Sequence, residues 1–484
     1  MKRSSILASS LGFLALGVGF AQPKAATSAK PAPRLEMVEA PVAKPGTPAP
    51  AAHVNPYNFP GVQFPRIEAD SRVTFQFKAP AAQKVQVSIA NIPFDMAKGG
   101  DGTWTYTSEP QAPGYHNYWM VVDGAIVLDP ATNTFIGYSH MCNGFEIPEP
   151  GVDYYDIKNV PHGNVLIRNY FAKSSNAWRH IFVYTPPGYD TNPSKRYPVL
   201  YLQHGGGEDE RVWIEMGRTN VILDNLMAEG KVSPFLVVME TSAVGGPGRG
   251  AGAGAGRGPG GPPAGGAAAA GAAPAGAAAG AGAGRGQGAG GGRAPGFGIA
   301  GPGGGAYGQF MTAELIPWVD ANFRTLSDRD HRAMAGLSMG GMQTAAVTMA
   351  NLDKFSHIGL FSGGTAPGFG AGGPGSPIRF DNPAATPALL DLKTIYNGQM
   401  ADVADFNHKV KVFFFSTGTL PPLENPEGLK KHQEQLAAAG ITNSYLYISP
   451  DTSHEWQTWR RSLYTFAPLL FRDGAPASAK PKKK

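Results

Sequence analysis

The chain has 484 residues, which predicts two or three domains, and its hydrophobic content of 42% is enough to build real cores. The formal net charge is +5, but six of the positive charges lie in Lys2, Arg3 and the terminal AKPKKK tail, so the body is close to neutral. A near-neutral body argues against a nucleic-acid partner, and the single Cys142 excludes an internal disulfide.

The first residues have the pattern of an export signal. Lys2 and Arg3 precede a short apolar run, and the small residues around Ala21 suit a cleavage site. Residues 1–21 are therefore predicted to be a signal peptide, which would place the protein in the periplasm or outside the cell. The apolar run is too short to act as a membrane anchor. Residues 22–54 are rich in Ala, Pro and Lys and are predicted to be a disordered linker.

Short alternating runs between residues 55 and 150 predict strands. Val73, Phe75 and Phe77 alternate with polar residues, and turn signals such as KGGDG separate one run from the next. This spacing predicts a small immunoglobulin-like β-sandwich. Three aromatic residues here can either bind a glycan or pack in the core, and core packing is favoured: Trp104, Tyr115 and Trp119.

A different pattern occupies residues 151–472. Six apolar runs predict buried strands: HIFVYTP, YPVLYLQHG, SPFLVVMET, HIGLFSGG, KVKVFFFSTG and SYLYISP. Helical patterns such as RTNVILDNLMAEG lie between them, so we expect a mostly parallel α/β sheet flanked by helices. Residues 245–306, almost wholly Gly, Ala and Pro, are predicted to be a disordered insertion, and the basic residues 473–484 a disordered tail.

The stretch HRAMAGLSMGGMQTAAV contains the candidate nucleophile, Ser338. A Gly-x-Ser-x-Gly pentad alone is a weak signal, and an ordinary turn explains it equally well. Here an apolar run precedes the pentad and a helical pattern follows it. That context is typical of a nucleophile elbow, the sharp strand-to-helix turn that exposes a serine hydroxyl. Gly336 and Gly340 leave room for the neighbouring backbone.

Two further loops carry what a serine nucleophile needs. His454 follows the last apolar run, where the base belongs in an enzyme whose triad runs Ser, acid, His along the chain. The HGGG loop at 204–207 is like the element that supplies an oxyanion-hole amide, so the N–H groups of Gly206 and Met339 are the predicted donors. No Cys/His cluster or zinc-helix spacing is present, and no metal or other cofactor is expected.

These stretches together resemble the esterase branch of the α/β-hydrolases, which includes feruloyl and acetylxylan esterases of carbohydrate esterase family 1 and enterochelin esterases. The matching stretches are VYTPPGYDTN, YPVLYLQHGGGEDE, HRAMAGLSMGGMQ and SHEWQTWRRSLYTFAPLLF. The segment before them, with RVTFQFKAP, DGTWTY and VVDGAIVLDP, is similar to the early-set, starch-binding-like β module that often precedes such esterases. The resemblance implies an α/β-hydrolase fold and serine ester chemistry, without fixing the substrate.

The resemblance also implies roles for individual residues. Ser338 attacks the ester carbonyl, and His454 accepts its proton. Trp213, just past the oxyanion loop, is a candidate to stack on an aromatic acyl group or a sugar, although structural packing explains it equally well. Relatives commonly carry an acid close behind a Gly-Thr at the end of KVKVFFFSTG, but Leu420 and Pro421 stand there in this chain.

The first carboxylate on that loop is Glu424, which we predict to orient His454. Glu427 fits better in the first turn of the next helix, where an acid suits the helix dipole. Asp451, three residues before His454, is the alternative orienting group. A solvated glutamate beside a weakened Ser–His pair explains the sequence nearly as well.

The sequence therefore predicts an exported serine esterase that acts on feruloyl or acetyl esters of plant cell-wall polysaccharide. An enterochelin esterase uses the same machinery and is the nearest alternative. A non-catalytic carbohydrate-binding relative and an enzyme that transfers acyl groups to a glycan are further alternatives. The expected partner is an ester substrate, with no nucleic acid and no stable membrane insertion once the signal is removed.

Overall fold

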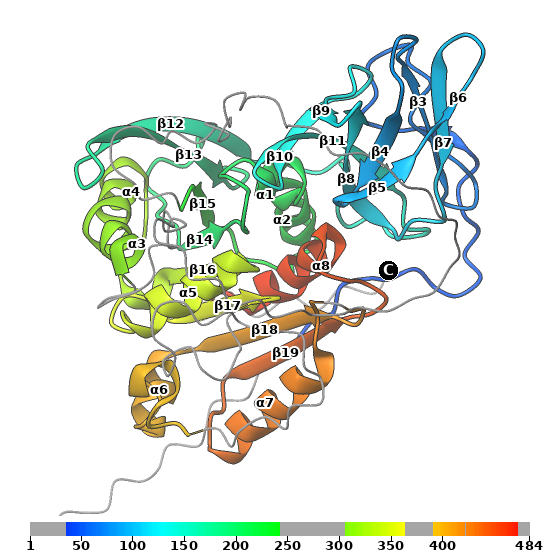
Figure 1. The fold of residues 1–484 in the computed structure, drawn as a ribbon. Helices are drawn as coiled ribbons and strands as arrows, with labels where there is room; N and C mark the ends of the chain where they lie inside the picture. Colours follow the sequence, from blue (N-terminus) through cyan, green and yellow to red (C-terminus); the bar gives the residue numbers. More distant parts are fainter. Residues whose placement is uncertain (1–34, 243–304, 364–390, 422, 473–484) are drawn as a thin grey trace, which may run out of the picture. The chain divides into compact units, whose positions relative to one another are not determined.

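The computed structural model describes residues 35–242, 305–363, 391–421 and 423–472. The predicted signal peptide, the predicted basic tail and nearly all of the predicted insertion lie outside these residues. The described chain forms a β module, residues 35–150, and an α/β module, residues 151–472 (Figure 1). No helix within the described ranges is long and apolar enough to cross a bilayer.

The β module contains two antiparallel sheets. The first has the strand order β1 (His53–Val54), β2 (Arg66–Ile67), β3 (Val73–Lys78), β7 (Thr103–Thr107) and β6 (Ala97–Lys98). The second has the order β10 (Thr134–Gly137), β11 (His140–Ile147), β8 (Gly114–Val122), β4 (Val85–Ile89) and β5 (Ile92–Asp95), with β9 (Ala125–Val127) paired to β8. Both sheets contribute to one core, in which the rings of Phe75 and Tyr118 lie 5.0 Å apart.

The side chains of the β module follow the predicted alternation. Val73 and Phe75 of β3 are buried, whereas the residue between them is partly exposed. Trp104 and Trp119 are 6% and 3% exposed and pack in the core, as favoured above. Tyr115 is also buried, but it borders the cavity described below. The resemblance of this module to an early-set domain stays a prediction.

The α/β module is built on one eight-stranded sheet. Its strand order is β12 (Asn164–Ala172), β13 (Ala177–Thr185), β15 (Leu236–Glu240), β14 (Val199–Gln203), β16 (Arg332–Leu337), β17 (His357–Phe361), β18 (Val412–Gly418) and β19 (Ser444–Ser449). The strand β13 pairs antiparallel with β12 and β15, and the remaining pairs are parallel. The predicted mostly parallel sheet is confirmed, and all six predicted apolar strands are part of it.

Helices cover both faces of this sheet (Figure 1). One face carries α3 (Gly305–Phe310), α4 (Ile316–Asn322), α5 (Met339–Met349), α6 (Val403–Lys409) and α7 (Pro426–Ala438). The other face carries α1 (Val212–Glu215), α2 (Thr219–Ala228) and α8 (Trp456–Phe466), with Phe466 packed on Phe361 and Phe414. Because both faces are covered, the strands β14 to β18 are buried at every residue, which explains their continuous apolar runs.

Part of the predicted disordered linker is packed. Ala40 is buried, and its N–H donates to Thr465 Oγ1 of α8 at 3.2 Å. The N–H of Ala43 donates to Glu149 Oε1 at 2.8 Å. The structure contradicts the prediction around Ala40 and Ala43, because their partners lie far along the chain and local composition does not reveal them.

The predicted insertion also ends slightly too late. The helix α3 begins at Gly305, whereas the Gly-rich pattern suggested a boundary at Ala306. Tyr307 is fully buried in this helix, and its hydroxyl donates to Gln203 Oε1. Phe310 of the same helix is also buried, so two aromatic side chains dock the short helix on the core.

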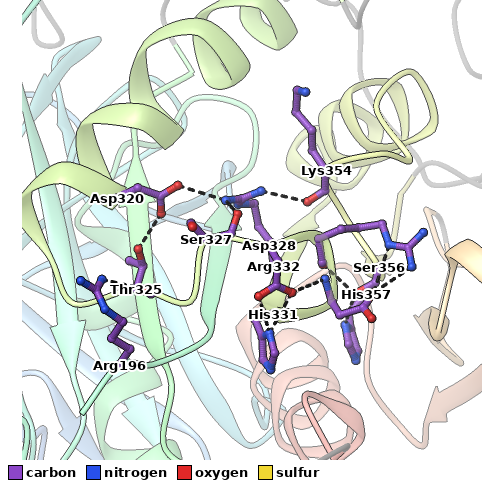
Figure 2. Close-up of polar contacts among 12 residues, drawn as sticks. Arg196, Asp320, Thr325, Ser327, Asp328, His331, Arg332, Lys354, Ser356 and His357 are labelled. Atoms are coloured by element: carbon purple, nitrogen blue, oxygen red, sulfur yellow. Dashed lines mark hydrogen bonds and ion pairs between the residues drawn. The ribbon is translucent and has the colours of Figure 1, made fainter. Parts of the chain in front are cut away.

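Arg332 is a buried charge at the first residue of β16. Figure 2 shows its guanidinium among three neighbouring segments, where it donates to Asp320 Oδ2 at 3.1 Å and to the carbonyl oxygens of Ser327 and Lys354 at 2.6 and 3.2 Å. These bonds satisfy the buried charge and fix the start of the strand whose opposite end leads to Ser338.

A buried polar interface joins the two modules along α8. Arg461 Nη2 donates to Glu149 Oε1 at 2.7 Å, and Gln457 Nε2 donates to the other oxygen of the same carboxylate. All three side chains are nearly inaccessible to solvent. The helix that ends the α/β module is therefore also a wall of the β module.

Candidate active site

Ser338 lies at the sharp turn between β16 and α5. Its backbone has φ 50° and ψ −117°, a conformation that residues with side chains rarely adopt. A Cβ on Gly340 would lie 2.4 Å from the carbonyl oxygen of His204, and one on Gly336 would lie 2.5 Å from the carbonyl of Gly340. Both positions therefore require glycine. The geometry is that of the predicted nucleophile elbow.

The structure brings three predicted side chains into one hydrogen-bonded chain. His454 Nε2 lies 2.8 Å from Ser338 Oγ, and His454 Nδ1 lies 2.9 Å from Glu424 Oε1. Since an ionised carboxylate only accepts hydrogen bonds, Nδ1 carries the proton and Nε2 is left to accept from the serine. The three residues follow β16, β18 and β19, so they meet at the carboxyl edge of the sheet.

Glu424 is held in place by more than its histidine. Its Oε2 accepts hydrogen bonds from Thr417 Oγ1 and from the N–H of Gly418, the latter at 3.0 Å. Burial alone would raise the pKa of Glu424, but the hydrogen bonds from His454 and Thr417 outweigh it and hold that pKa below its usual value. The carboxylate therefore stays ionised beside the imidazole.

The other two carboxylates considered above lie elsewhere. Asp451 is exposed, and its backbone N–H donates to Thr419 Oγ1 at 2.8 Å. Glu427 is in the first turn of α7, as expected, where it pairs with Lys430 at 2.7 Å. Of these three acids, only Glu424 makes a hydrogen bond with His454.

The HGGG loop lies against the beginning of α5. The ring of His204 is buried between Gly205 O, 2.7 Å from Nδ1, and the N–H of Ser242, which donates to Nε2 at 3.2 Å. Burial lowers the pKa of His204, which favours a neutral ring. Its Nδ1–H then donates to Gly205 O and fixes the loop from within.

Neither of the two predicted oxyanion donors has a protein acceptor in the described part of the chain. Within the described residues, the N–H of Gly206 makes no hydrogen bond. Met339 is the first residue of α5, and the N–H groups of a first helical turn have no acceptor inside the helix. A Cβ on Gly206 would lie 4.0 Å from Met339 Sδ, so the two residues are neighbours. Both amides are available to a ligand at the elbow.

A cavity of about 220 Å³ opens over Ser338 and His454. Part of its wall comes from the β module: Ala90, Tyr115, His116, Asn117, Gly137 and Tyr138. Sequence reasoning did not assign any of these residues to the site around Ser338, because only the tertiary packing brings the two modules together. The N–H of Ser139 also donates to Gly207 O at 2.9 Å, which ties the oxyanion loop to the β10–β11 turn.

Trp213, the predicted stacking residue, does not border the cavity. It is 1% exposed, and its ring packs edge-on against Phe361 and Trp456. The prediction is wrong because α1 directs this side chain onto the sheet. Trp456 and Trp459 of α8 border the cavity instead, and the Trp459 ring lies edge-on to His454 at 5.2 Å. Most of the surface of Trp459 is nevertheless buried in the core.

Glu208 is a further polar residue of the cavity that sequence reasoning did not single out. It follows the HGGG loop directly, and its Oε2 accepts from the N–H of Gly205 at 2.8 Å. Its position in the sequence could have drawn attention to it. A carboxylate directly after the HGGG loop lies close to the predicted oxyanion, where a negative charge is electrostatically unfavourable.

Comparison with known proteins adds an independent result. A family model described as "Putative esterase" matches residues 172–247 and 281–469. An endo-1,4-β-xylanase/feruloyl esterase of Xylanibacter ruminicola is 32% identical over 426 residues, which are 86% of this chain and 47% of the relative. An esterase of Mycobacterium tuberculosis is 27% identical over 339 residues, 64% of this chain and 59% of the relative. The chain spans about half the length of these curated relatives.

Among solved structures, the enterobactin esterase of Shigella flexneri in the presence of enterobactin matches with a TM-score of 0.52. The match covers 83% of this chain and 93% of that chain at 13% identity. At this identity the likeness concerns the fold alone. Together with the strand order above, it confirms the predicted α/β-hydrolase fold.

Proposed function

Because this chain belongs to the esterase family whose model matches residues 172–247 and 281–469, we propose that it is a serine carboxylic-ester hydrolase that works through an acyl-enzyme. The observation that supports this proposal is the series of hydrogen bonds from Ser338 through His454 to Glu424. Ser338 and His454 also border a cavity that can hold a substrate. A nucleophile, a base and an orienting acid in this geometry are what acyl transfer by serine requires.

The geometry supports a two-step reaction. Ser338 Oγ attacks the ester carbonyl while His454 Nε2 takes the hydroxyl proton, and Glu424 stabilises the imidazolium that forms. The N–H groups of Gly206 and Met339 stabilise the oxyanion of the tetrahedral intermediate. His454 then gives its proton to the leaving alcohol, and the acyl group stays on Ser338. A water molecule activated by the same histidine releases the acid.

We propose feruloyl or acetyl esters of plant cell-wall polysaccharide as the substrate class. The relative from Xylanibacter ruminicola is named for feruloyl ester cleavage, and its similarity extends over 86% of this chain. Four aromatic side chains border the cavity and suit the flat ring of an aromatic acyl group: Tyr115, Tyr138, Trp456 and Trp459. From the sequence of residues 1–21 we also propose that the enzyme is exported. Export agrees with a polysaccharide substrate.

A siderophore trilactone is the second candidate substrate. One observation favours it: the likeness to the enterobactin esterase fold covers 83% of this chain. The chemistry at Ser338 would be the same, since a trilactone also presents ester carbonyls to the nucleophile.

The test compares substrates on one preparation. We would measure kcat/KM of the protein lacking residues 1–21 for methyl ferulate, acetylated xylan and enterobactin, with Ser338→Ala as the background. A preference for methyl ferulate or acetylated xylan of tenfold or more over enterobactin supports the proposal. A preference for enterobactin selects the second candidate, and no turnover of any ester rejects both.

A further inference from the structure

Glu208 occupies an unusual place for a carboxyl group. It borders the cavity, is only partly exposed, and has no ion-pair partner among the residues that the structure describes. Its one hydrogen bond with the described residues is the one that Oε2 accepts from the N–H of Gly205. An acidic group beside donors intended for a developing negative charge opposes catalysis when it is ionised, so its presence there needs a reason.

The hydrogen bond between Glu208 and Gly205 is one of three that hold the HGGG loop, residues 204–207, in place. The carbonyl of Gly205 is held by His204, and the carbonyl of Gly207 is held by the N–H of Ser139. Glu208 accepts a hydrogen bond from the N–H of Gly205. In the described loop, the N–H of Gly206 has no protein acceptor and remains available to a ligand. A loop fixed at both neighbours cannot turn this donor away from the elbow.

The space around Gly205 gives the same result. A Cβ built on Gly205 would lie 2.6 Å from Leu337 Cδ1 and 3.0 Å from Glu208 Oε2. The Glu208 carboxyl and the side chain of Leu337, the residue before the nucleophile, therefore both pack closely against Gly205. Together they leave no room for a side chain at this position of the loop.

We propose that Glu208 is a positioning residue. Its neutral carboxyl aligns the Gly206 N–H with the Met339 N–H, so that both groups can donate to the oxyanion. The inference rests on the proposed function, because it assigns those two amides to an oxyanion.

Electrostatics supports the neutral form. Burial, with a smaller contribution from the charge of Asp209, raises the pKa of Glu208 to about 8 against the opposing hydrogen bond from the N–H of Gly205. The titratable groups around it come from its own loop, from the β module and from the far side of the cavity: His204, Asp209, Tyr115, His116, Tyr138, Cys142, His454 and Glu455. None of these is a fixed cation, and Asp209 itself is paired with Arg211 at 2.8 Å. Above pH 8 the ionised carboxylate would repel the oxyanion.

Two variants separate alignment from charge. Glu208→Gln keeps an oxygen acceptor for the Gly205 N–H and is neutral at every pH. Glu208→Ala removes the acceptor. We would measure kcat and KM for methyl ferulate from pH 6 to 9.5, with Glu215→Gln as a control, because Glu215 is a partly buried carboxylate of α1 outside the cavity.

We expect Glu208→Gln to stay within about threefold of the wild-type kcat at pH 7 and to lose the fall in kcat above pH 8. We expect Glu208→Ala to lose about 10- to 100-fold in kcat with KM little changed, less than the 10²–10³ that follows removal of an oxyanion donor itself. A wild-type kcat in Glu208→Ala, or the same alkaline fall in Glu208→Gln, would overturn the inference.

A readout without turnover distinguishes this inference from the proposed function. Amide hydrogen exchange of the 204–207 loop should speed up in Glu208→Ala and stay at the wild-type rate in Glu208→Gln and Glu215→Gln. Unchanged exchange in Glu208→Ala contradicts the positioning role, whatever the activity. Wild-type protein that hydrolyses no ester, with faster exchange in Glu208→Ala, rejects the proposed function alone.

Discussion

Arg460 of α8 and Glu146 of β11 form a buried two-point ion pair between the modules, with Nη1–Oε1 at 2.5 Å and Nη2–Oε2 at 3.1 Å. The Glu146 carboxylate also accepts from the hydroxyl of Tyr57 at 2.9 Å. Burial would raise the pKa of Glu146, but Arg460 and Arg218 outweigh it and hold that pKa below its usual value. The ionised carboxylate of this β-module residue therefore depends mainly on arginines of the α/β module.

Arg460→Met should destabilise the whole protein. It leaves Glu146 as a buried charge without its main partner, which costs about 3–5 kcal/mol of unfolding free energy. The double variant Glu146→Leu with Arg460→Met should recover most of this loss, because an apolar pair carries no desolvation cost. Urea unfolding measures all three proteins, and Lys430→Met, which breaks an exposed pair with Glu427, should cost less than about 1 kcal/mol. Equal stability of Arg460→Met and wild type would contradict the role of the pair.

Ser338→Ala should remove ester hydrolysis and leave the fold intact. Loss of a serine nucleophile costs on the order of 10⁶ in kcat. The matched control is Ser453→Ala, because Ser453 borders the same cavity without contacting His454 through its hydroxyl. Hydrolysis of p-nitrophenyl acetate measures both variants, and melting temperatures check their folding. Wild-type turnover in Ser338→Ala would exclude the proposed mechanism.

Glu424→Gln should lower kcat by about 10² to 10⁴ and leave KM little changed. The amide keeps the shape, but it removes the charge that fixes the His454 tautomer and stabilises the imidazolium. Glu427→Gln and Asp451→Asn serve as controls and should keep the wild-type kcat, because neither side chain bonds to His454. A wild-type kcat for Glu424→Gln between pH 6 and 9 would show that another group orients the base.

The pH dependence of stability provides a further check on Glu208. Its pKa is 4.5 as a free side chain and about 8 in the folded protein, so the folded state holds a proton that the unfolded chain has released between these values. Its contribution to stability is present in full below pH 4.5 and is lost as the pH rises through 8. Glu208→Gln cannot lose a proton, so its stability relative to wild type should increase from pH 5 to pH 9. A difference that is constant over that range, measured beside the exposed Glu434→Gln, would show that Glu208 is already ionised.

Much of the fold followed from local patterns. The strands β13 to β15 and β17 to β19 were recognisable because a sheet covered on both faces needs continuous apolar runs. Ser338 and His454 were recognisable because each follows such a run at a position that the chain order of the triad requires. These patterns depend on residues that are adjacent in the sequence, so they can be recognised without knowledge of the tertiary structure.

The remaining features depend on contacts between distant segments. The edge strand β12 has exposed residues at many positions, so it lacked the apolar run that marked its neighbours. Trp213 was a candidate for substrate contact because sequence proximity to the HGGG loop says nothing of the direction in which α1 points its side chains. The β-module residues of the cavity wall, such as Tyr115 and Tyr138, were not predicted. The local sequence does not show that the β module packs on α8.

The hydrogen bond between Ala40 and Thr465 has a consequence for how the protein matures. These residues are 425 positions apart, so at 5–20 residues per second the ribosome adds the second about 20 to 85 s after the first. During that interval the segment around Ala40 has no α8 on which to pack, and the β module lacks Arg460 and Arg461, which pair with its buried Glu146 and Glu149. His454 emerges just before the same helix. His454 and the docking helix α8 are therefore synthesised together, after the segments on which they pack.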